Sequence, residues 1–428
     1  MQINIGILGL GTVGCGTLEV LRRNASLITQ RAGCELHVAR IATKHPDKPR
    51  PIPLDRSILT GDVHEVLNDP DIHIVVELIG GIEPARDYVL RAIAAGKSVV
   101  TANKELIAKH GTDITDAADR AGVDFLFEGS VGGGIPLIKP LRESLVGNRV
   151  QQLMGIVNGT TNYILTKMAR DGGDFEAVLA EAQSLGYAEP DPSADVDGYD
   201  AMYKLAILAS IAFSTPVDIR DIYHDGIRHV DVRDIEYARE LGFVIKLIAL
   251  GRQHPDGELE LRVHPTLLPV DHPLANVNDV HNAVLVHGDA VGDVMFYGPG
   301  AGAEPTGSAV VGDMVEAARN FRRNARGRIL HAPVHTSKVK DWAEFETRFC
   351  LRMQVTDRPG MLAQIASVFG QKGVSLESIV QRRTDGDCAE IFWMTHCTSQ
   401  RAMARSIGEF NRLEAVREVS SVLRVEGA

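Results

Sequence analysis

The sequence of 428 residues lacks the apolar run of about 20 residues that a transmembrane helix requires. Its most apolar helical stretch, from Tyr203 to Phe213, is shorter than that and contains Lys204. The first residues also lack the basic cluster of a secretory signal. These absences predict a cytoplasmic protein that does not act on a membrane.

Cysteines and aromatic side chains are scarce as well. The five cysteines are scattered along the chain and never form a C-x-x-C pair. That arrangement favours reduced thiols over a disulfide framework or a zinc site. Aromatic residues make up only 5% of the chain, whereas glycine occurs 41 times. Such a composition is typical of an α/β protein with tight turns that ligands approach.

Positive charge is in deficit, because the formal net charge is -11. This balance argues against nucleic acid or an anionic membrane as the main partner. With 24% charged and 44% hydrophobic residues, the chain has an ordinary globular profile, and its length predicts about three domains. One segment, from Arg319 to Lys340, is basic and free of acids. We interpret it as a solvated linker, with a local anion site as the alternative.

The first third of the chain alternates short apolar runs with helical patterns. Strands that are buried on both faces and separated by helices indicate a parallel sheet. The middle third is predicted to be helix-rich as far as about Ala249, and strand-like segments then return. The expected strands are 3–8, 35–42, 72–78, 97–101, 123–127, 150–157, 259–264 and 283–287, and the expected helices include 12–23, 85–95, 201–213 and 308–320.

A new pattern begins at Phe349. The order of apolar runs is strand, helix, strand, strand, helix, strand in fewer than 80 residues, which predicts a ferredoxin-like domain. At the first turn of this domain, Asp357 is expected to cap the helix and Pro359 to lie in its first turn. The expected elements are 349–356, 361–372, 374–381, 389–396, 400–413 and 416–425.

A glycine-rich turn follows the first strand and fits G-x-G-x-x-G. Gly9 permits the tight turn, Gly11 lets the backbone approach a pyrophosphate, and Gly14 allows the helix to pack closely on the strand. The helix N-terminus that follows supplies donors for an anion. The motif therefore predicts a Rossmann-type dinucleotide site, whose loop consists of Gly9, Leu10, Gly11, Thr12, Val13 and Gly14.

The end of the second strand bears on the choice of cofactor. An NAD site normally ends this strand with an acid that binds the ribose, but here the strand leads into Thr43 and Lys44. Lys44 could pair with a 2′-phosphate, which favours NADP, with NAD tolerated. Alternatively, Lys44 is a solvated loop residue, and Asp47 nearby weakens the inference.

Two further motifs follow predicted strands. Asn103 and Lys104 come just after the strand 97–101, at the sheet edge where ligands bind in open α/β folds. A lysine there can hold a reacting oxygen, or it can simply open the next helix. The run from Glu128 to Pro136 contains three consecutive glycines, which suits backbone atoms that face a ligand or a monovalent cation. A plain hinge between domains would have the same composition.

The most unusual segment runs from Gly186 to Lys204. Several carboxylates precede an apolar helix, and Asp200 and Lys204 lie four residues apart on one helical face. A pair of this kind is often a surface salt bridge, but this lysine is embedded in an apolar stretch. Burial lowers the pKa of a lysine toward the range of a general acid. Glu189 and Asp200 could bind a substrate ammonium group, and no serine, cysteine or histidine nucleophile motif occurs.

Together these motifs resemble the homoserine dehydrogenase family, in the form with a C-terminal ACT domain. The resemblance spans essentially the whole chain and depends on the segments 9–14, 101–104, 128–136, 155–162 and 185–204. It implies an NAD(P)-dependent oxidoreductase that interconverts L-aspartate 4-semialdehyde and L-homoserine in threonine and methionine biosynthesis. It further implies four regions: a Rossmann-type NAD(P)-binding domain (1–130), an α+β catalytic and dimerisation domain (131–320), a linker (321–348) and an ACT domain (349–428).

The resemblance also implies roles for individual residues. Lys204 would give the proton to the aldehyde oxygen, and Lys104 would orient that oxygen. Glu189 and Asp200 would bind the amino acid. The cofactor would be contacted by Thr101, Lys104, Gly186 and Gly302, beside the turn at Gly9–Gly14 and Lys44. A sodium ion would be held by Glu128, Val131, Gly133 and Ile135.

Assembly and regulation follow from the same resemblance, which implies a homodimer or homotetramer. ACT domains sense amino acids, so threonine is the expected effector; a purely oligomerising module is the alternative. One departure is that the family often has arginine where this chain has Lys44, before Lys48-Pro49-Arg50. The positive charge is kept, but bidentate phosphate recognition at this position is lost.

Two other functions remain open from the sequence. Another ACT-bearing dehydrogenase that acts on a hydroxy acid would use a histidine–carboxylate base, but the motif cluster contains no histidine. A binding protein that senses nucleotides and amino acids would be expected to lose the lysine pair, which this chain has.

Overall fold

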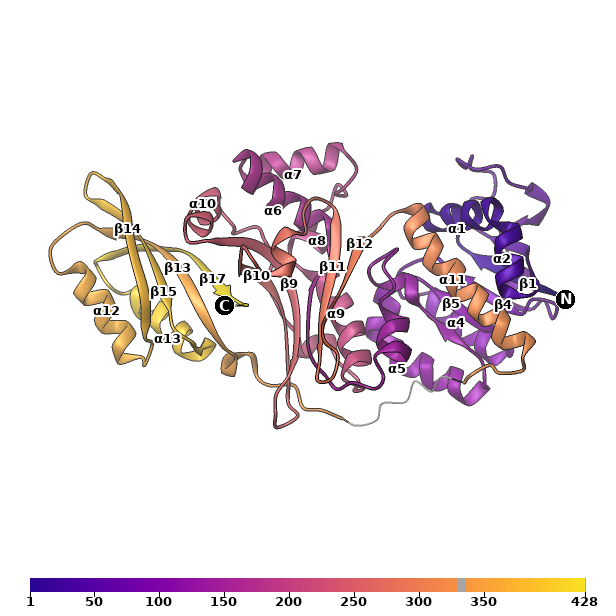
Figure 1. Ribbon diagram of the computed structural model, residues 1–428. Helices are drawn as coiled ribbons and strands as arrows, with labels where there is room; N and C mark the ends of the chain where they lie inside the picture. Colours follow the sequence, from indigo (N-terminus) through magenta and orange to yellow (C-terminus); the bar gives the residue numbers. More distant parts are fainter. Residues whose placement is uncertain (329–335, 428) are drawn as a thin grey trace. The chain divides into compact units, whose positions relative to one another are not determined.

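The computed structural model (Figure 1) describes residues 1–328 and 336–427. The chain divides into two compact units. The first comprises Met1–Leu153, Tyr203–Asp221 and Asn282–Thr336, and the second comprises Met154–Met202, Ile222–His281 and Ser337–Ala428. No helix of the described residues has the length and apolar character needed to cross a membrane.

The first unit is built on a six-stranded parallel sheet of order β3-β2-β1-β4-β5-β6. The order reverses between β1 and β4, and ligands of open α/β sheets bind at such a reversal. This arrangement confirms the predicted Rossmann-type sheet. Its elements are β1 Gln2–Leu8, α1 Thr12–Arg23, α2 Ala25–Ala32, β2 Glu35–Ala42, β3 Leu59–Thr60, α3 His64–Leu67, β4 Ile74–Glu77, α4 Ala85–Ala94, β5 Ser98–Thr101, α5 Lys104–Ala121 and β6 Phe125–Leu126.

A helix from much later in the chain completes the core of this sheet. α11 (Ala303–Arg322) buries Val310, Met314 and Ala317 among the side chains of β1 and α1. The helix begins five residues before the predicted start at 308, because Pro305 is tolerated in a first helical turn and does not end the helix. The predicted range 131–320 therefore includes a helix that packs in the core of the first unit.

The basic segment is not a simple solvated tether. Arg319 donates two hydrogen bonds to the carbonyl of Arg31, and Arg322 donates to the carbonyl of Gly33 at 2.8 Å. Arg326 donates to the carbonyl of Gly96 at 2.9 Å. These guanidinium groups fix the end of α11 to the rest of the first unit. The predicted linker 321–348 falls partly on residues 329–335, which lie outside the described residues.

The remaining elements of the first unit include α9 (Tyr199–Ala212), β11 (His281–Gly288) and β12 (Gly292–Pro299). α9 packs close to α5, because the Lys109 ammonium lies 5.2 Å from the centre of the Tyr203 ring. The boundary between the two units falls within the helix α9 and within the strand β7 (Val150–Ile156), so each of these elements has residues in both units.

The second unit begins with three helices and a long antiparallel pair. Its elements before the final domain are α6 Gly159–Asp171, α7 Phe175–Ser184, α8 Ser193–Val196, β8 Tyr223–His224, α10 Val232–Glu240, β9 Phe243–Gln253 and β10 Leu259–Pro269. The predicted helix-rich stretch is confirmed as far as Glu240, but its end at about Ala249 is wrong, since β9 begins at Phe243 and pairs with β10 over its full length. Residues 245–251 of β9 are buried on both faces, so the run shows no alternation that would mark a strand.

The last part of the second unit has the predicted ferredoxin-like order. Its elements are β13 Glu346–Thr356, α12 Met361–Gln371, β14 Leu376–Asp385, β15 Cys388–Thr395, β16 Thr398–Ser399, α13 Gln400–Phe410 and β17 Val416–Val425. The strand order is β17-β13-β15-β14, and both helices cover the sheet (Figure 1). In the core between them, the Phe369 ring contacts Trp393 and Phe410.

The start of α12 differs from the prediction. Gly360, at a φ of 86°, is the N-cap residue, and no side chain caps the helix. Asp357 is therefore not the cap, and Pro359 precedes the helix. Glycine suits position 360 because residues with a Cβ rarely adopt the positive φ that the backbone has there.

Candidate active site

The turn after β1 has the geometry that a pyrophosphate requires. Gly9 has a φ of 101°, and a Cβ at this position would lie 2.5 Å from the Leu78 carbonyl oxygen. A Cβ on Gly14 would lie 2.7 Å from the Gly9 oxygen, whereas the space beside Gly11 is open. Gly11 is the N-cap of α1 and offers no side chain, and the first turn contains no acid. The first helical N–H groups are thus available to an anion, which fits a dinucleotide.

The end of β2 presents two cations. Lys44 is exposed, as a solvated residue or a phosphate partner would be. Arg50 folds back on the loop and donates to the Thr43 hydroxyl at 3.3 Å and to the His45 carbonyl at 3.1 Å. Its charge also reaches Cys15 of α1, where it opposes the rise in thiol pKa that burial causes. Sequence reasoning noted Arg50 only within Lys-Pro-Arg and did not assign it a role.

The carboxyl ends of β4 and β5 are joined by hydrogen bonds. The buried Glu77 accepts from the Thr101 hydroxyl at 2.7 Å and from the amide of Ile79. Asn103 caps α5 by accepting from Leu106, and its amide donates to the Gly81 carbonyl. The Thr101 hydroxyl is therefore engaged within the protein. Lys104 is the first residue of α5, at the edge of the sheet that the sequence indicated.

The loop from Glu128 to Ile135 does not use its carboxylate as an open ligand. The buried Glu128 side chain accepts hydrogen bonds from the amides of Leu137, Ile138 and Lys139, all at 2.8 Å or less. Gly133 adopts a φ of 53°, and Val131 is fully buried. In the described part of the chain, no group of three or more histidine, cysteine, aspartate or glutamate residues could hold a metal ion. Any cation here would be held by main-chain carbonyl oxygens.

A buried carboxyl group lies directly beneath this loop. Asp313 of α11 accepts from the backbone N–H of Glu128 at 2.8 Å. Burial, and secondarily the charge of Glu128, raises the pKa of Asp313 well above its usual value. Arg142 lies 4.5 Å from the centre of the Phe127 ring, and burial lowers its pKa to about 10. The loop is thus fixed to α11.

Lys204 lies in the middle of α9 and is buried, with 8% of its surface exposed. Its neighbour Tyr203 contacts Lys109 of α5, the helix that begins with Lys104. The two lysines singled out in the sequence therefore lie on helices that pack together in the first unit. Gly302, at a φ of 124°, is the N-cap of α11.

The carboxylates of the second unit meet at an amide. The Asn158 side chain donates to Asp195 at 2.7 Å and to Asp200 at 2.8 Å. Its oxygen accepts from the backbone of Thr161 at 2.8 Å and thereby caps α6. Sequence reasoning did not assign a role to Asn158 or Asp195, since their partners lie about 40 residues away. Glu189 and Gly186 are exposed in the loop between α7 and α8.

A buried lysine supports the start of α6. Lys246 of β9 donates to Asn162 and Asn278 at 3.1 Å each, and also to the Val277 carbonyl. Asn162 in turn donates to the Val277 and His281 carbonyls. Burial lowers the pKa of Lys246 to about 8. This cluster holds the helix that carries Asn158 at its N-terminus.

These features define a nicotinamide-dependent oxidoreductase. They are a Rossmann-type sheet with an uncapped dinucleotide turn, lysines on adjoining helices, and a carboxylate pair joined by an amide. Comparisons with known families narrow this class. The homoserine dehydrogenase profile matches residues 136–315, the NAD-binding domain of homoserine dehydrogenase matches residues 9–128, and the ACT domain matches residues 351–415.

Relatives align over nearly the full length. A homoserine dehydrogenase of Synechocystis sp. is 49% identical, over 99% of this chain and 100% of the relative, and one of Corynebacterium glutamicum is 45% identical over 99% and 96%. The structure of a Thiobacillus denitrificans homoserine dehydrogenase has a TM-score of 0.93 at 44% identity and covers 100% of this chain and 98% of its own. The chain belongs to the homoserine dehydrogenase family, in the form that carries a C-terminal ACT domain.

Proposed function

We propose that this homoserine dehydrogenase catalyses the reversible NAD(P)H-dependent reduction of L-aspartate 4-semialdehyde to L-homoserine, in threonine and methionine biosynthesis. The buried Lys204, on the helix that also carries Asp200, is the observation on which the proposal depends most. A hydroxy-acid dehydrogenase would use a histidine–carboxylate base, whereas in this chain the Asn158 amide donates to both Asp195 and Asp200.

The two lysines have different roles in this proposal. The bound nicotinamide supplies the hydride. Lys204 gives its proton to the aldehyde oxygen, which becomes the homoserine hydroxyl. Lys104, at the start of α5, orients the same oxygen. Positioned proton transfer of this kind contributes about 10²- to 10⁴-fold to rate.

The carboxylates bind the amino acid. Asp200 and Glu189 attract the substrate ammonium group, and Asn158 keeps Asp200 and Asp195 in fixed positions. The amide carries no charge of its own and donates one hydrogen bond to each of the two carboxylates.

The test follows the absorbance of the reduced cofactor with L-homoserine as substrate. Lys204→Met should lower kcat by about 100-fold or more, while the KM for the cofactor stays within a factor of two. Lys338→Met is the matched control, since Lys338 is 77% exposed and pairs only with Glu258 among described contacts. Near wild-type turnover of Lys204→Met would remove this lysine from the mechanism.

For the cofactor, we propose a preference for NADP, with Lys44 and Arg50 at the 2′-phosphate. Arg50 is held by the Thr43 hydroxyl and the His45 carbonyl, so its guanidinium is ordered before a ligand arrives. Arg50→Ser should lower kcat/KM for NADP by about tenfold or more and leave that for NAD within threefold. Lys48→Ala, an exposed neighbour, is the control. Equal losses with both cofactors would refute the assignment.

A monovalent cation, sodium by resemblance, would be bound by the main-chain carbonyls of Glu128, Val131, Gly133 and Ile135. The left-handed turn at Gly133 and the internal hydrogen bonds of the Glu128 carboxylate support this mode of binding. For the ACT domain (349–428) we propose amino-acid sensing, with threonine as the expected effector, and for the whole chain a homodimer or homotetramer. Titration calorimetry with threonine, and sedimentation, test these two points.

A further inference from the structure

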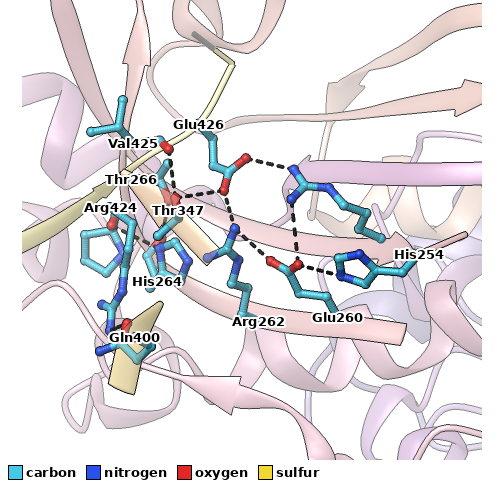
Figure 2. A network of polar contacts seen from close by, with 12 residues as sticks. His254, Glu260, Arg262, His264, Thr266, Thr347, Gln400, Arg424, Val425 and Glu426 are labelled. Carbon is cyan, nitrogen blue, oxygen red and sulfur yellow. Dashed lines mark hydrogen bonds and ion pairs between the residues drawn. The ribbon is translucent and has the colours of Figure 1, made fainter. Parts of the chain in front are cut away.

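The final strand of the ACT domain, β17, also pairs with β10, a strand of the second unit that precedes the ACT domain. β17 runs parallel to β10, with Arg424 opposite Thr266 and Val425 opposite Leu267. The next residue, Glu426, donates its backbone N–H to the Leu267 carbonyl and pairs with Arg252 at 2.9 Å and with Arg262. Figure 2 shows Arg262 between the carboxylates of Glu426 and Glu260, with Arg424 beside Gln400. The strand is thus anchored independently of Arg424.

Arg424 contacts the short segment from Tyr223 to Asp225. Its guanidinium donates to the Tyr223 hydroxyl at 2.9 Å and lies 5.0 Å from the centre of the same ring. It also pairs with Asp225 at 3.8 Å and donates to Gln400 at 3.3 Å. The Arg424 side chain is 7% exposed, so water screens these contacts poorly. Tyr223 is further held by a stacked Trp342 ring.

The segment that Arg424 holds packs directly on α8. A Cβ on Gly226 would lie 2.6 Å from the Asp197 Cα, so the two backbones are already in contact. Ile227 donates its N–H to the Val196 carbonyl at 2.8 Å, and Arg228 pairs with Asp197. Because these backbones are close-packed with no side chain between them, a shift of the segment 223–228 would open a gap unless α8 moved with it.

α8 carries Asp195, the carboxylate that Asn158 joins to Asp200. From this series of contacts we propose that Arg424, a residue of the ACT domain, is a positioning residue for Asp195 and Asp200, the carboxylates that Asn158 joins. It fixes the segment 223–228, which fixes α8 and hence Asp195. The inference rests on the proposed role of these carboxylates in binding homoserine. It means that their positions depend on contacts made by the C-terminal strand β17.

The test measures steady-state kinetics of the full-length enzyme. Arg424→Gln should raise the KM for homoserine about three- to tenfold, while kcat and the KM for NADP stay within twofold, because only the preorganisation of the ammonium site is lost. Arg424→Lys, which keeps the charge beside Asp225, should recover part of the loss. Arg417→Gln is the matched control, since Arg417 is on the same strand and pairs outward with Asp387.

A second variant guards against a folding defect. Tyr223→Phe removes only the hydroxyl that Arg424 binds and should raise the KM for homoserine in the same direction. The double variant should be no worse than Arg424→Gln, as expected for one shared contact. A KM for homoserine within twofold of wild type in both single variants, or equal effects on both substrates, would overturn the proposal. If the wild type itself shows no homoserine-dependent reduction of NADP, the proposed function fails first, and the two failures are distinguishable.

Discussion

Two glycines of α11 are predicted to respond in opposite ways to replacement by alanine, because only one of them lies in the contact with α1. Alanine should lower the thermal stability at Gly307 and raise it slightly at Gly312. Gly307 faces α1: a Cβ there would lie 2.6 Å from the Thr17 nitrogen and 2.7 Å from the Gly16 carbonyl carbon. Gly312, five residues on, is exposed, and no atom lies within 4 Å of its Cβ position. Non-bonded carbon contacts need about 3.5 Å, so alanine at 307 would push α11 away from α1 by roughly 1 Å.

The magnitudes follow from this geometry. Overpacking of a tight contact costs about 1–3 kcal/mol, and the gain in helix propensity from glycine to alanine offsets at most about 1 kcal/mol. Gly307→Ala should therefore lower the Tm by about 2–6 °C. Gly312→Ala should raise it slightly, because it has the same propensity gain without the clash.

The cofactor should report the same displacement. The dinucleotide turn leads into α1, and Gly302 opens α11. Gly307→Ala should raise the KM for NADP severalfold and leave the KM for homoserine within twofold. Thermal unfolding without ligands and initial rates at varied cofactor concentration make the comparison. A Gly307→Ala protein as stable as Gly312→Ala would refute the described packing.

Three further predictions concern buried charge and ligands. Arg352 and Arg233 both pair with Glu390, but their side chains are 5% and 49% exposed. Arg352→Met should therefore cost about 3–5 kcal/mol in urea unfolding, and Arg233→Met less than about 1 kcal/mol; equal costs would contradict this difference. For Lys246, whose pKa burial lowers to about 8, the burial cost is present in full below pH 8. Wild-type stability should thus rise between pH 8 and about 10.4, by at most about 3 kcal/mol since three acceptors oppose the shift, and Lys246→Met should lack the rise. Replacing sodium with tetramethylammonium should lower the Tm and slow turnover if the carbonyl loop binds a cation; unchanged values would argue against one.

The parts of the fold that local signals encode were predictable from the sequence. β1, α1 and β2 were predicted to within one residue, because a glycine turn and regular apolar periodicity mark their ends. The ACT strand β17 was also predicted with its observed bounds. These elements depend on residues close together in the chain, so the sequence specifies them directly.

Where burial on both faces removes periodicity, the boundary was wrong, since the predicted helix-rich stretch continued past Glu240 into β9. β9 has an apolar run interrupted only by Lys246, which neither a helical nor an alternating pattern explains. Lys246 is buried because three oxygens from two other segments accept its protons. A buried lysine with distant partners has no sequence signature, and the strand around it could not be recognised.

The same limit explains why the sequence pointed to the charged residues of the proposed site and not to the Asn158 amide, which hydrogen-bonds Asp195 and Asp200. Lys204 and Asp200 stand out because charge inside an apolar run is unusual, whereas Asn158 is unremarkable before a helix. In the structure each polar atom of Asn158 is used: two N–H bonds go to Asp195 and Asp200, and the oxygen accepts from the Thr161 N–H and hydroxyl. A lysine at 158 would neutralise one carboxylate, and an aspartate would repel both and lose the donors. Only an amide can cap α6 with its oxygen and also donate to both carboxylates, and that requirement exists only once α6, α8 and α9 are brought together.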